Sequence, residues 1–379
     1  MRNSITVSPI LLSEYEQAVK STDLFLESEI IPIQMGLFGE VGSVMTASKK
    51  LYREENAFSV GYMDDVEEEL GDTLWYFTAL CRRFKFSLAD LFSEVLGSGN
   101  YSVHIATNSD PNYPVSQVIS VNNLKQHHTV LLKLGEHTAH LLCIEIEPKK
   151  VKPLLLEFIR IYIEALQALE VSFSSVINGN IAKVKGRFIK PSLEDLPDFD
   201  STFPLEEQLP RTFEIEITQR PNGRSYLRWN GVFLGDPLSD NIVDQDGYRF
   251  HDVFHFANAA ILHWSPTFRS LIKHKRKSDP KVDETQDSGR AIVVDEGVSA
   301  YIFSQAKTLN FFEGHTSVSF DMLEDVSNFV RGYEVEQCPL NLWENAILQG
   351  YEVFRHILKH NGGIVVGNRD KRTLEYKSL

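Results

Sequence analysis

The most informative stretch in the first half of this chain is Glu68-Glu69-Leu70-Gly71-Asp72-Thr73-Leu74-Trp75-Tyr76. Its apolar residues recur at helical spacing, and Glu69 and Asp72 are three residues apart, so both carboxylates lie on one face of a helix. Two carboxylates on one face repel each other unless a cation or a proton lies between them. Such oxygen ligands suit Mg²⁺, which proteins hold with a few carboxylates and substrate phosphates. The stretch therefore predicts a helix with a phosphate-handling metal site.

A third carboxylate lies in the segment Gly39-Glu40-Val41-Gly42-Ser43. This segment is part of an expected amphipathic helix from Ile30 to Tyr52, and the helix with the paired carboxylates is expected from Asp64 to Phe84. Residues 97–122 are rich in Gly, Pro, Asn and Ser and are expected to form a loop or a small insertion. Residues 1–96 are therefore predicted to form an all-α unit.

The pattern of this unit recurs after the loop. Residues 154–176 align with residues 69–91 without a gap, which predicts a tandem repeat whose second copy spans residues 123–190. The corresponding residues are Glu136 for Glu40, Glu157 for Asp72 and Leu154 for Glu69. The second copy thus lacks the full set of carboxylates. The alternative is that any two pairs of amphipathic helices resemble each other to this extent.

The second copy ends in the polar stretch Asn180-Ile181-Ala182-Lys183-Val184-Lys185-Gly186-Arg187. Together with the two carboxylate segments, it resembles the all-α nucleoside triphosphate pyrophosphohydrolases, the MazG and dimeric-dUTPase group, over about residues 10–190. In that group one helix carries ExxE and the next ExxD, commonly written GEVGE and EELGD. Members often end in Asn-x-x-Lys-x-x-x-Arg.

The resemblance implies a Mg²⁺-dependent enzyme, with Mn²⁺ as a substitute metal, that hydrolyses an NTP or dNTP to the monophosphate and pyrophosphate. It makes Glu40, Glu69 and Asp72 the metal ligands and catalytic residues. Ser43 departs from the pattern, because the group has a second Glu there, and Glu68 is an uncertain substitute. The expected substrate-binding residues are Lys49, Lys50, Asn180, Lys183 and Arg187. Carboxylates of the first copy and the polar tail of the second would then form one composite site, a single-chain imitation of a dimer.

Less specific interpretations of these residues stay open. The acidic run from Asp64 to Glu69 is also typical of a solvated helix face, and Lys49 and Lys50 of a solvated helix end. A second function is that the degenerate helical half senses nucleotides without cleaving them and is coupled to a metal-dependent hydrolase in the C-terminal domain. Ser43 and the stripped second copy favour this alternative.

Beyond residue 190 the composition changes. Residues 191–211 are acidic and Pro-rich, which predicts a linker or an extended strap. Residues 212–379 are predicted to form an α+β, mostly helical domain that begins with a strand from Thr212 to Thr218 and a hairpin turn at Asn222-Gly223. The other expected elements are a strand from Ser225 to Leu234, helices Tyr248–His263, Pro266–Lys273, Ala291–Phe312, Asp321–Val335 and Asn341–His360, and a strand from Gly363 to Gly367.

The C-terminal domain carries an HDxxH motif, His251-Asp252-Val253-Phe254-His255. Two His residues one helical turn apart suit Zn²⁺ or another transition metal, so a second divalent metal is a candidate cofactor, with Glu296 as a third ligand. The alternative is a pair of partly buried, hydrogen-bonded histidines. Basic residues around Lys275 and Arg276 lie between the expected helices. They could capture a phosphate, and the alternative is that they form a charged surface loop. The candidate second site comprises His251, Asp252, His255, Lys275, Arg276, Arg290 and Glu296.

The composition of this chain limits the classes of partner that it can bind. Its 379 residues suffice for two or three domains, and the net charge of −14 argues against general nucleic-acid binding. Cys81, Cys143 and Cys338 are too few and scattered for a disulfide framework, which fits a reducing cytoplasm. The sequence has no apolar run long enough for a membrane span, so we expect no membrane association. Nucleoside triphosphates are the expected partners, and a homodimer is compatible with the repeat.

Overall fold

The computed structural model describes residues 11–53, 62–98, 102–103, 119–120, 127–142, 148–189 and 191–379. The chain divides into two compact units, Met1–Ile189 and Lys190–Leu379. None of the described helices is both long and apolar enough to cross a membrane. Cys81 and Cys338 are buried free thiols, and Cys143 lies outside the described residues.

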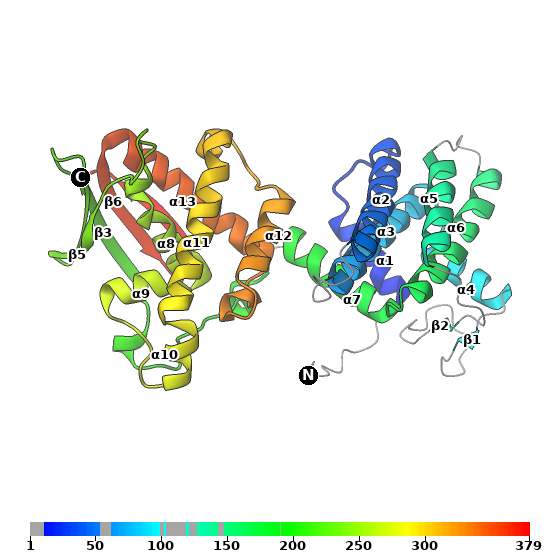
Figure 1. Cartoon of the computed structure of the whole chain (residues 1–379), viewed down its shortest axis with the longest axis horizontal. Coiled ribbons are helices and arrows are strands. Elements are labelled where there is room, and N and C mark those ends of the chain that lie inside the picture. The colour runs from blue at the N-terminus through cyan, green and yellow to red at the C-terminus, as the bar shows by residue number, and fades with distance from the viewer. Residues whose placement is uncertain are drawn as a thin grey trace. The chain divides into compact units, whose positions relative to one another are not determined.

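Helices form nearly all of the first unit where the structure describes it (Figure 1). They are α1 (Leu12–Thr22), α2 (Ile31–Arg53), α3 (Tyr62–Arg83), α4 (Leu88–Ser98), α5 (His127–Leu142), α6 (Pro148–Ala168) and α7 (Phe173–Phe188). Two short antiparallel strands, β1 (Ser102–Val103) and β2 (Ile119–Ser120), lie in the segment expected to be a loop or insertion, most of which is outside the described residues.

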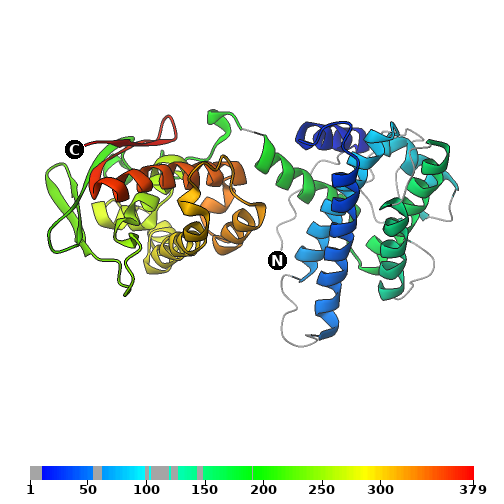
Figure 2. The same ribbon diagram turned by 90° about the horizontal axis from the view of Figure 1, so that it is seen from above.

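Apolar faces hold these helices together. The helix α2 packs against α3 and α5, and α5 packs against α6. Figure 2 shows the same packing from above, with the long α2 in blue. Aromatic rings fill the space between α3 and α6, where Phe77 and Phe158 stack with centroids 4.2 Å apart. Because both rings are fully buried, this contact contributes strongly to the core of the first unit.

The helix bounds agree with the register of the proposed repeat. In that register Arg83, the last residue of α3, matches Ala168, the last of α6, and Leu88, the first of α4, matches Phe173, the first of α7. The contacts of α3 with α7 and of α6 with α4 are also equivalent under it. These agreements support the repeat, which stays a proposal because no sequence or structural relative tests it.

The second unit is built on one antiparallel sheet with the strand order β5-β4-β3-β6-β7. The strands are β3 (Thr212–Gln219), β4 (Ser225–Trp229), β5 (Val232–Leu238), β6 (Gly362–Asn368) and β7 (Thr373–Lys377). The strand β6, which follows the last helix, pairs with β3, and Ile215 lies opposite Val365 in the middle of that pair. Both residues are fully buried, so the two ends of this unit meet in its core.

Helices cover this sheet, and α13 and α8 contact its strands (Figure 1). The α-helices are α8 (Asp252–Ala257), α9 (Pro266–Ile272), α10 (Pro280–Gln286), α11 (Gly289–Ala306), α12 (Phe320–Phe329) and α13 (Leu340–His360). The 3₁₀ segments are η1 (Leu193–Asp195), η2 (Leu205–Glu207), η3 (Tyr248–Phe250), η5 (Lys307–Phe312) and η6 (Glu334–Gln337), and η4 (Asn258–Leu262) is a π-helix.

Several expected elements differ in the structure. The helix expected from Tyr248 to His263 is a succession of η3, α8 and the π-helical η4, and it ends where His263 adopts a φ of 59°. The helix expected from Ala291 to Phe312 ends as an α-helix at Ala306 and passes into the 3₁₀ segment η5, in which Asn310 and Phe311 take positive φ values. Hydrophobic periodicity continues through such breaks, and therefore does not reveal them. The same reasoning overlooked α10 and β7 and ran β4 and β5 together.

Of the two interpretations of residues 191–211, the structure shows a strap. Asp200 is fully buried and accepts hydrogen bonds from the backbone N–H of Leu209 and from Arg269 and Arg369, at 2.7, 2.5 and 2.8 Å. Leu209 is part of the hydrophobic core of the second unit. The strap is thus held by buried charge as well as apolar packing, which a flexible linker lacks.

Candidate functional site

Three carboxylates of the first unit converge. Glu69 and Asp72 lie one turn apart on α3, and Glu40 faces them from α2, which packs along α3. One oxygen of each carboxylate lies within 4.8 Å of the others. All three residues are partly buried, so water screens their mutual repulsion less than it would at a fully exposed surface.

Burial and like charge change the protonation of this cluster. Burial, followed by the charges of Asp72 and Glu69, raises the pKa of Glu40 to about 8. Burial also raises the pKa of Glu69 and of Asp72. Near neutral pH the crowded carboxylates therefore favour a proton on Glu40.

The helix α7 supplies polar partners for Asp72. Asn180 donates to one carboxylate oxygen of Asp72 at 2.8 Å, and the Lys183 Nζ lies 2.6 Å from the other. Lys183 also bonds Glu68. Burial lowers the pKa of Lys183, but the charges of Asp72 and Glu68 more than offset this and raise it above its usual value. The sequence expectation gave Asn180 and Lys183 to the substrate, and in the structure both hold Asp72.

Two tyrosines and a glycine that the sequence reasoning missed support this arrangement. The Tyr15 hydroxyl donates to the side-chain oxygen of Asn180 at 2.9 Å, and Tyr162 donates to the carbonyl of Leu70 at 2.7 Å. A Cβ placed on Gly71 would lie 3.0 Å from the Cβ of Asn180. The glycine therefore lets α7 approach α3 closely. No spacing in the sequence indicates the contact of Tyr15, because its partner lies 165 residues away.

Tyr76 is a further neighbour of the cluster. Burial, and then the charges of Glu40 and Asp72, raise the pKa of its hydroxyl. Its ring lies against Gly36 of α2, where an added Cβ would be only 2.2 Å from a ring carbon. One signal could have found it, because Tyr76 is four residues after Asp72 and so lies on the same helical face.

The other expected substrate and metal residues are placed differently. Ser43 lies one turn after Glu40 and is partly buried, on the same side of α2. Lys49 is exposed and two and a half turns beyond Glu40, so it lies on the opposite side of this helix. The side chain of Lys50 is outside the described part of the chain. Arg187 is one turn beyond Lys183 and partly exposed.

The second copy contributes no comparable cluster among the described residues. Glu157, which matches Asp72, is exposed and pairs with Arg160 at 2.9 Å. Glu136, which matches Glu40, is also exposed. Within the described part of the first unit, the carboxylates of α2 and α3 are thus the one group placed to share a cation.

In the second unit, His251, His255 and Glu296 converge, each with a ligand atom within 4.8 Å of the others. Asp252 of the same motif is buried, which raises its pKa, and it is not among these convergent atoms. Arg290, expected to belong to this site, is exposed at the start of α11.

Arg276, within the basic stretch from Lys273 to Lys277, has a structural role. Arg276 is 1% exposed and pairs with Asp287 at 2.7 Å and Glu334 at 2.6 Å. Its guanidinium is therefore engaged inside the domain and does not serve as a surface phosphate-binding group. Lys275, beside it, is partly exposed.

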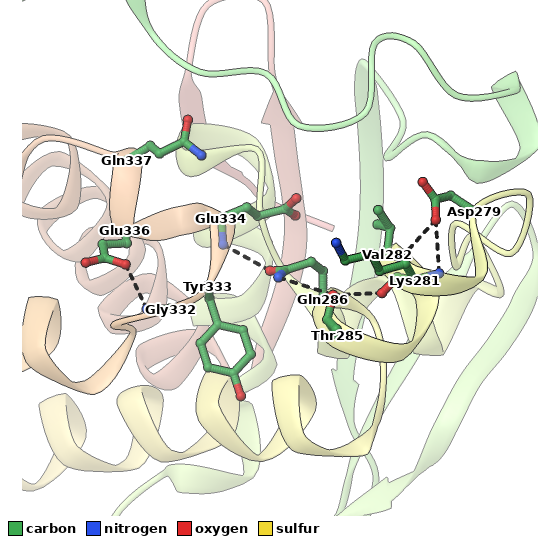
Figure 3. Close-up of a pocket in the computed structure, with 10 residues that line it drawn as sticks. All are labelled: Asp279, Lys281, Val282, Thr285, Gln286, Gly332, Tyr333, Glu334, Glu336 and Gln337. Atoms are coloured by element: carbon green, nitrogen blue, oxygen red, sulfur yellow. Dashed lines mark hydrogen bonds between the residues drawn. The ribbon is translucent and has the colours of Figure 1, made fainter. Parts of the chain in front are cut away.

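An open cavity of about 610 Å³ lies between α10 and η6 (Figure 3). Its polar groups bond one another, since the Glu334 backbone N–H donates to Gln286 at 3.0 Å and that of Gly332 to Glu336 at 2.7 Å. The cavity contains no histidine and none of the convergent carboxylates. It is therefore not the centre of either candidate site.

Comparison with known proteins gives one result. Residues 194–379 match the family model described as MazG C-terminal domain. The match begins within the strap and covers the sheet and all helices of the second unit. No curated protein and no solved structure matches this chain significantly. The C-terminal match supports placing this chain in a MazG-related family.

Proposed function

We propose that the first unit is a Mg²⁺-dependent nucleoside triphosphate pyrophosphohydrolase that releases a nucleoside monophosphate and pyrophosphate. The observation that carries this proposal is the convergence of Glu40, Glu69 and Asp72 with the polar face of α7. These residues come from three helices, two in the first copy of the proposed repeat and one in the second. The MazG-related C-terminal domain agrees with this activity, without naming a substrate.

The residues fit Mg²⁺. Three hard oxygen donors within 4.8 Å of one another suit a cation that keeps several waters and takes only a few protein carboxylates. The raised pKa of Glu40 supports a cation here, because burial and the charges of Asp72 and Glu69 both disfavour its ionised form. Glu40, Glu69 and Asp72 would hold the ion, with the hydroxyl of Ser43 as a neutral neighbour. Bound Mg²⁺ would offset charge on the phosphate oxygens and orient the attacking water.

The polar residues of α7 position the carboxylates. Asn180 and Lys183 engage both oxygens of Asp72, so the carboxylate group cannot rotate away from the cluster. Tyr15 fixes the amide of Asn180 in turn, because its hydroxyl donates to the amide oxygen and leaves the NH₂ group to face Asp72. The positive charge of Lys183 also brings a phosphate-attracting group beside the carboxylates. Arg187, one turn further, would meet phosphate oxygens with its planar fork.

A panel assay tests the proposal. Purified full-length protein is incubated with each NTP and dNTP and Mg²⁺, and monophosphate and pyrophosphate are measured. Turnover is expected in the wild type and a loss of at least 100-fold in Asp72→Asn, which keeps the size of the side chain but removes its charge. The matched control is Glu157→Gln, at the equivalent exposed position of the second copy, and it should keep wild-type activity. Absence of turnover with every nucleotide, or unchanged turnover in Asp72→Asn, would refute the proposal.

A second candidate function is nucleotide sensing without cleavage, coupled to a metal-dependent hydrolase in the second unit. Ser43 favours it, because the site has one carboxylate fewer than the related enzymes. Calorimetric titration with the same nucleotides distinguishes the two functions. Saturable binding with no product supports sensing, and measurable product excludes it.

A further inference from the structure

His251, His255 and Glu296 form a second cluster of a different chemical kind. The two histidines lie one turn apart around the start of α8, and Glu296 faces them from α11. The Nε2 atom of each imidazole lies 3.4 Å from the same carboxylate oxygen of Glu296. The cluster thus combines two nitrogen donors with one oxygen donor, whereas the first site has oxygen donors alone.

The surroundings determine which ring nitrogen of each histidine faces this cluster. The Nδ1 atom of His251 lies 2.8 Å from the backbone carbonyl of Tyr248, and a carbonyl only accepts. The Nδ1 atom of His255 lies 3.0 Å from the carboxylate of Asp295. Both Nδ1 atoms therefore carry a hydrogen, and in the neutral rings both Nε2 lone pairs point towards Glu296.

Asp295 is itself held in place. It is fully buried and accepts hydrogen bonds from the side chains of Asn258 and Ser265, at 3.1 and 2.7 Å, and from the backbone N–H of Thr267 at 3.2 Å. Asn258 begins the π-helical segment η4, a rare conformation that is frequent at functional sites. A buried carboxylate that orients a ligating imidazole through Nδ1 is the usual outer partner of a metal-bound histidine.

When both imidazoles are neutral, the cluster has no positive charge at its centre. Two nitrogen lone pairs and a carboxylate oxygen face one another, and all three are acceptors. The Nε2 atom of His255 is completely buried and has no hydrogen-bond partner. A cation bound at this point would satisfy all three groups at once.

The distances from the two Nε2 atoms to Glu296 distinguish a bound metal ion from hydrogen bonds made by protonated imidazoles. A charge-assisted N–H···O hydrogen bond measures about 2.7–2.9 Å, shorter than the 3.4 Å seen from both rings to Glu296. Ligand atoms about 2.05 Å from a tetrahedral metal are about 3.3 Å from one another, which agrees with the observed distance. We propose that His251, His255 and Glu296 bind a divalent transition-metal ion, with Asp295 positioning His255.

The donor set selects the kind of ion. Imidazole favours Zn²⁺, Co²⁺, Ni²⁺ or Fe²⁺, whereas Mg²⁺ prefers oxygen alone. The Glu296 side chain is 39% exposed, so one side of the cluster faces solvent. Three protein ligands with solvent access leave a coordination position for water, as in catalytic zinc sites.

Metal titration tests this proposal independently of nucleotide cleavage. Full-length protein without a polyhistidine tag is stripped with a chelator and titrated with Zn²⁺, and with Co²⁺ for its visible absorption, in excess Mg²⁺ to saturate carboxylate sites. One equivalent of Zn²⁺ is expected to bind the wild type. Glu296→Gln, at the solvent-facing ligand, is expected to weaken Zn²⁺ binding at least tenfold, and His255→Ala to abolish stoichiometric binding. Asp295→Asn should weaken Zn²⁺ binding about 10–100-fold.

His360→Ala is the matched control, because His360 is an exposed histidine near the end of α13. It should bind Zn²⁺ as the wild type does. Thermal unfolding shows which variants retain the fold, and Glu296→Gln keeps the test valid if His255→Ala does not fold, since its side chain is partly exposed. Equal affinity and stoichiometry in the wild type and Glu296→Gln, or no Zn²⁺ binding by the wild type, would overturn the proposal.

Discussion

Lys183 acts as an internal cation for the carboxylates of α3, and replacing it with Met should show how strongly they require positive charge. Its Nζ lies 2.6 Å from Asp72 and also bonds Glu68. Met keeps much of the length and apolar volume of the lysine side chain but removes the charge. In the metal-free protein the variant therefore leaves Asp72 with Asn180 as its remaining bonded partner from α7.

The magnitude follows from burial. Loss of one partner of a fully buried ion pair costs about 3–5 kcal/mol, and a hydrogen bond to a charged group contributes about 1.5–3 kcal/mol. The side chains of Lys183 and Asp72 keep 16% and 20% of their exposure, so solvent screens part of the pair. We expect a loss of about 2 kcal/mol in the free energy of unfolding of the first unit. For a unit of this size, that lowers the unfolding midpoint by about 4–8 °C.

Mg²⁺ should reverse most of this loss. A ligand that binds only the folded state stabilises it in proportion to the logarithm of concentration over Kd. Without the competing charge of Lys183, the carboxylates should bind the cation more tightly, so saturating Mg²⁺ should raise the midpoint of Lys183→Met more than that of the wild type. Scanning calorimetry of the full chain measures this, and the transition of the second unit serves as an internal reference.

Lys185→Met is the matched control, because Lys185 is an exposed residue of the same helix. A surface substitution of this kind is expected to change stability by no more than about 0.5 kcal/mol. Equal midpoints for the two variants in the absence of metal would refute the reasoning. An identical effect of Mg²⁺ on the wild type and on Lys183→Met would refute it as well.

Three further perturbations test other parts of the structure. Gly36→Ala should destabilise the first unit by about 1–3 kcal/mol in urea unfolding and lower nucleotide turnover, because the new Cβ meets the Tyr76 ring at 2.2 Å. Gly39→Ala is the control: its new Cβ has nothing within 4 Å, so it should be neutral or stabilising by up to about 1 kcal/mol. Asp200→Asn should cost the second unit about 3–5 kcal/mol, since it weakens the pairing of two buried arginines, and a loss below about 1 kcal/mol would show that the strap is not held by charge. Burial alone would raise the pKa of Asp198, but the charges of Arg369 and Arg211, which each donate a hydrogen bond to it at 2.8 Å, hold that pKa well below its usual range. The contribution of Asp198 to stability is therefore present above pH about 4 and is lost at lower pH. Unfolding midpoints of the wild type and Asp198→Asn should therefore differ near neutral pH and converge as the pH falls below about 4, and a constant difference would contradict this sign.

The helical half of the chain illustrates what local pattern can predict. The spacing of Glu69 and Asp72 places them on one helical face whatever the rest of the fold does, because a helical turn has a fixed length. The same holds for the two histidines of the HDxxH motif. Apolar periodicity likewise indicated α2, α3 and most helices of the second unit, although not where they break.

Contacts between distant segments required the tertiary structure. The sequence pattern predicted Asn180 and Lys183 as substrate-binding residues, but not that both hold Asp72, because that depends on how closely α7 approaches α3 over Gly71. The same limit explains why Tyr15 was missed and why Arg276 was assigned to a surface role. A side chain's partner across the fold depends on packing, which local spacing does not encode.

Local sequence pattern was enough to predict the chemical character of both candidate sites: carboxylates alone in the first unit, and imidazoles with a carboxylate in the second. It did so because ligand type and helical spacing are local properties. Which atoms meet depends on folding: Asp295 lies against the Nδ1 atom of His255, and residues 191–211 form a strap held by buried charge. These are consequences of burial and of the approach of distant segments, and they arise only once the chain has folded.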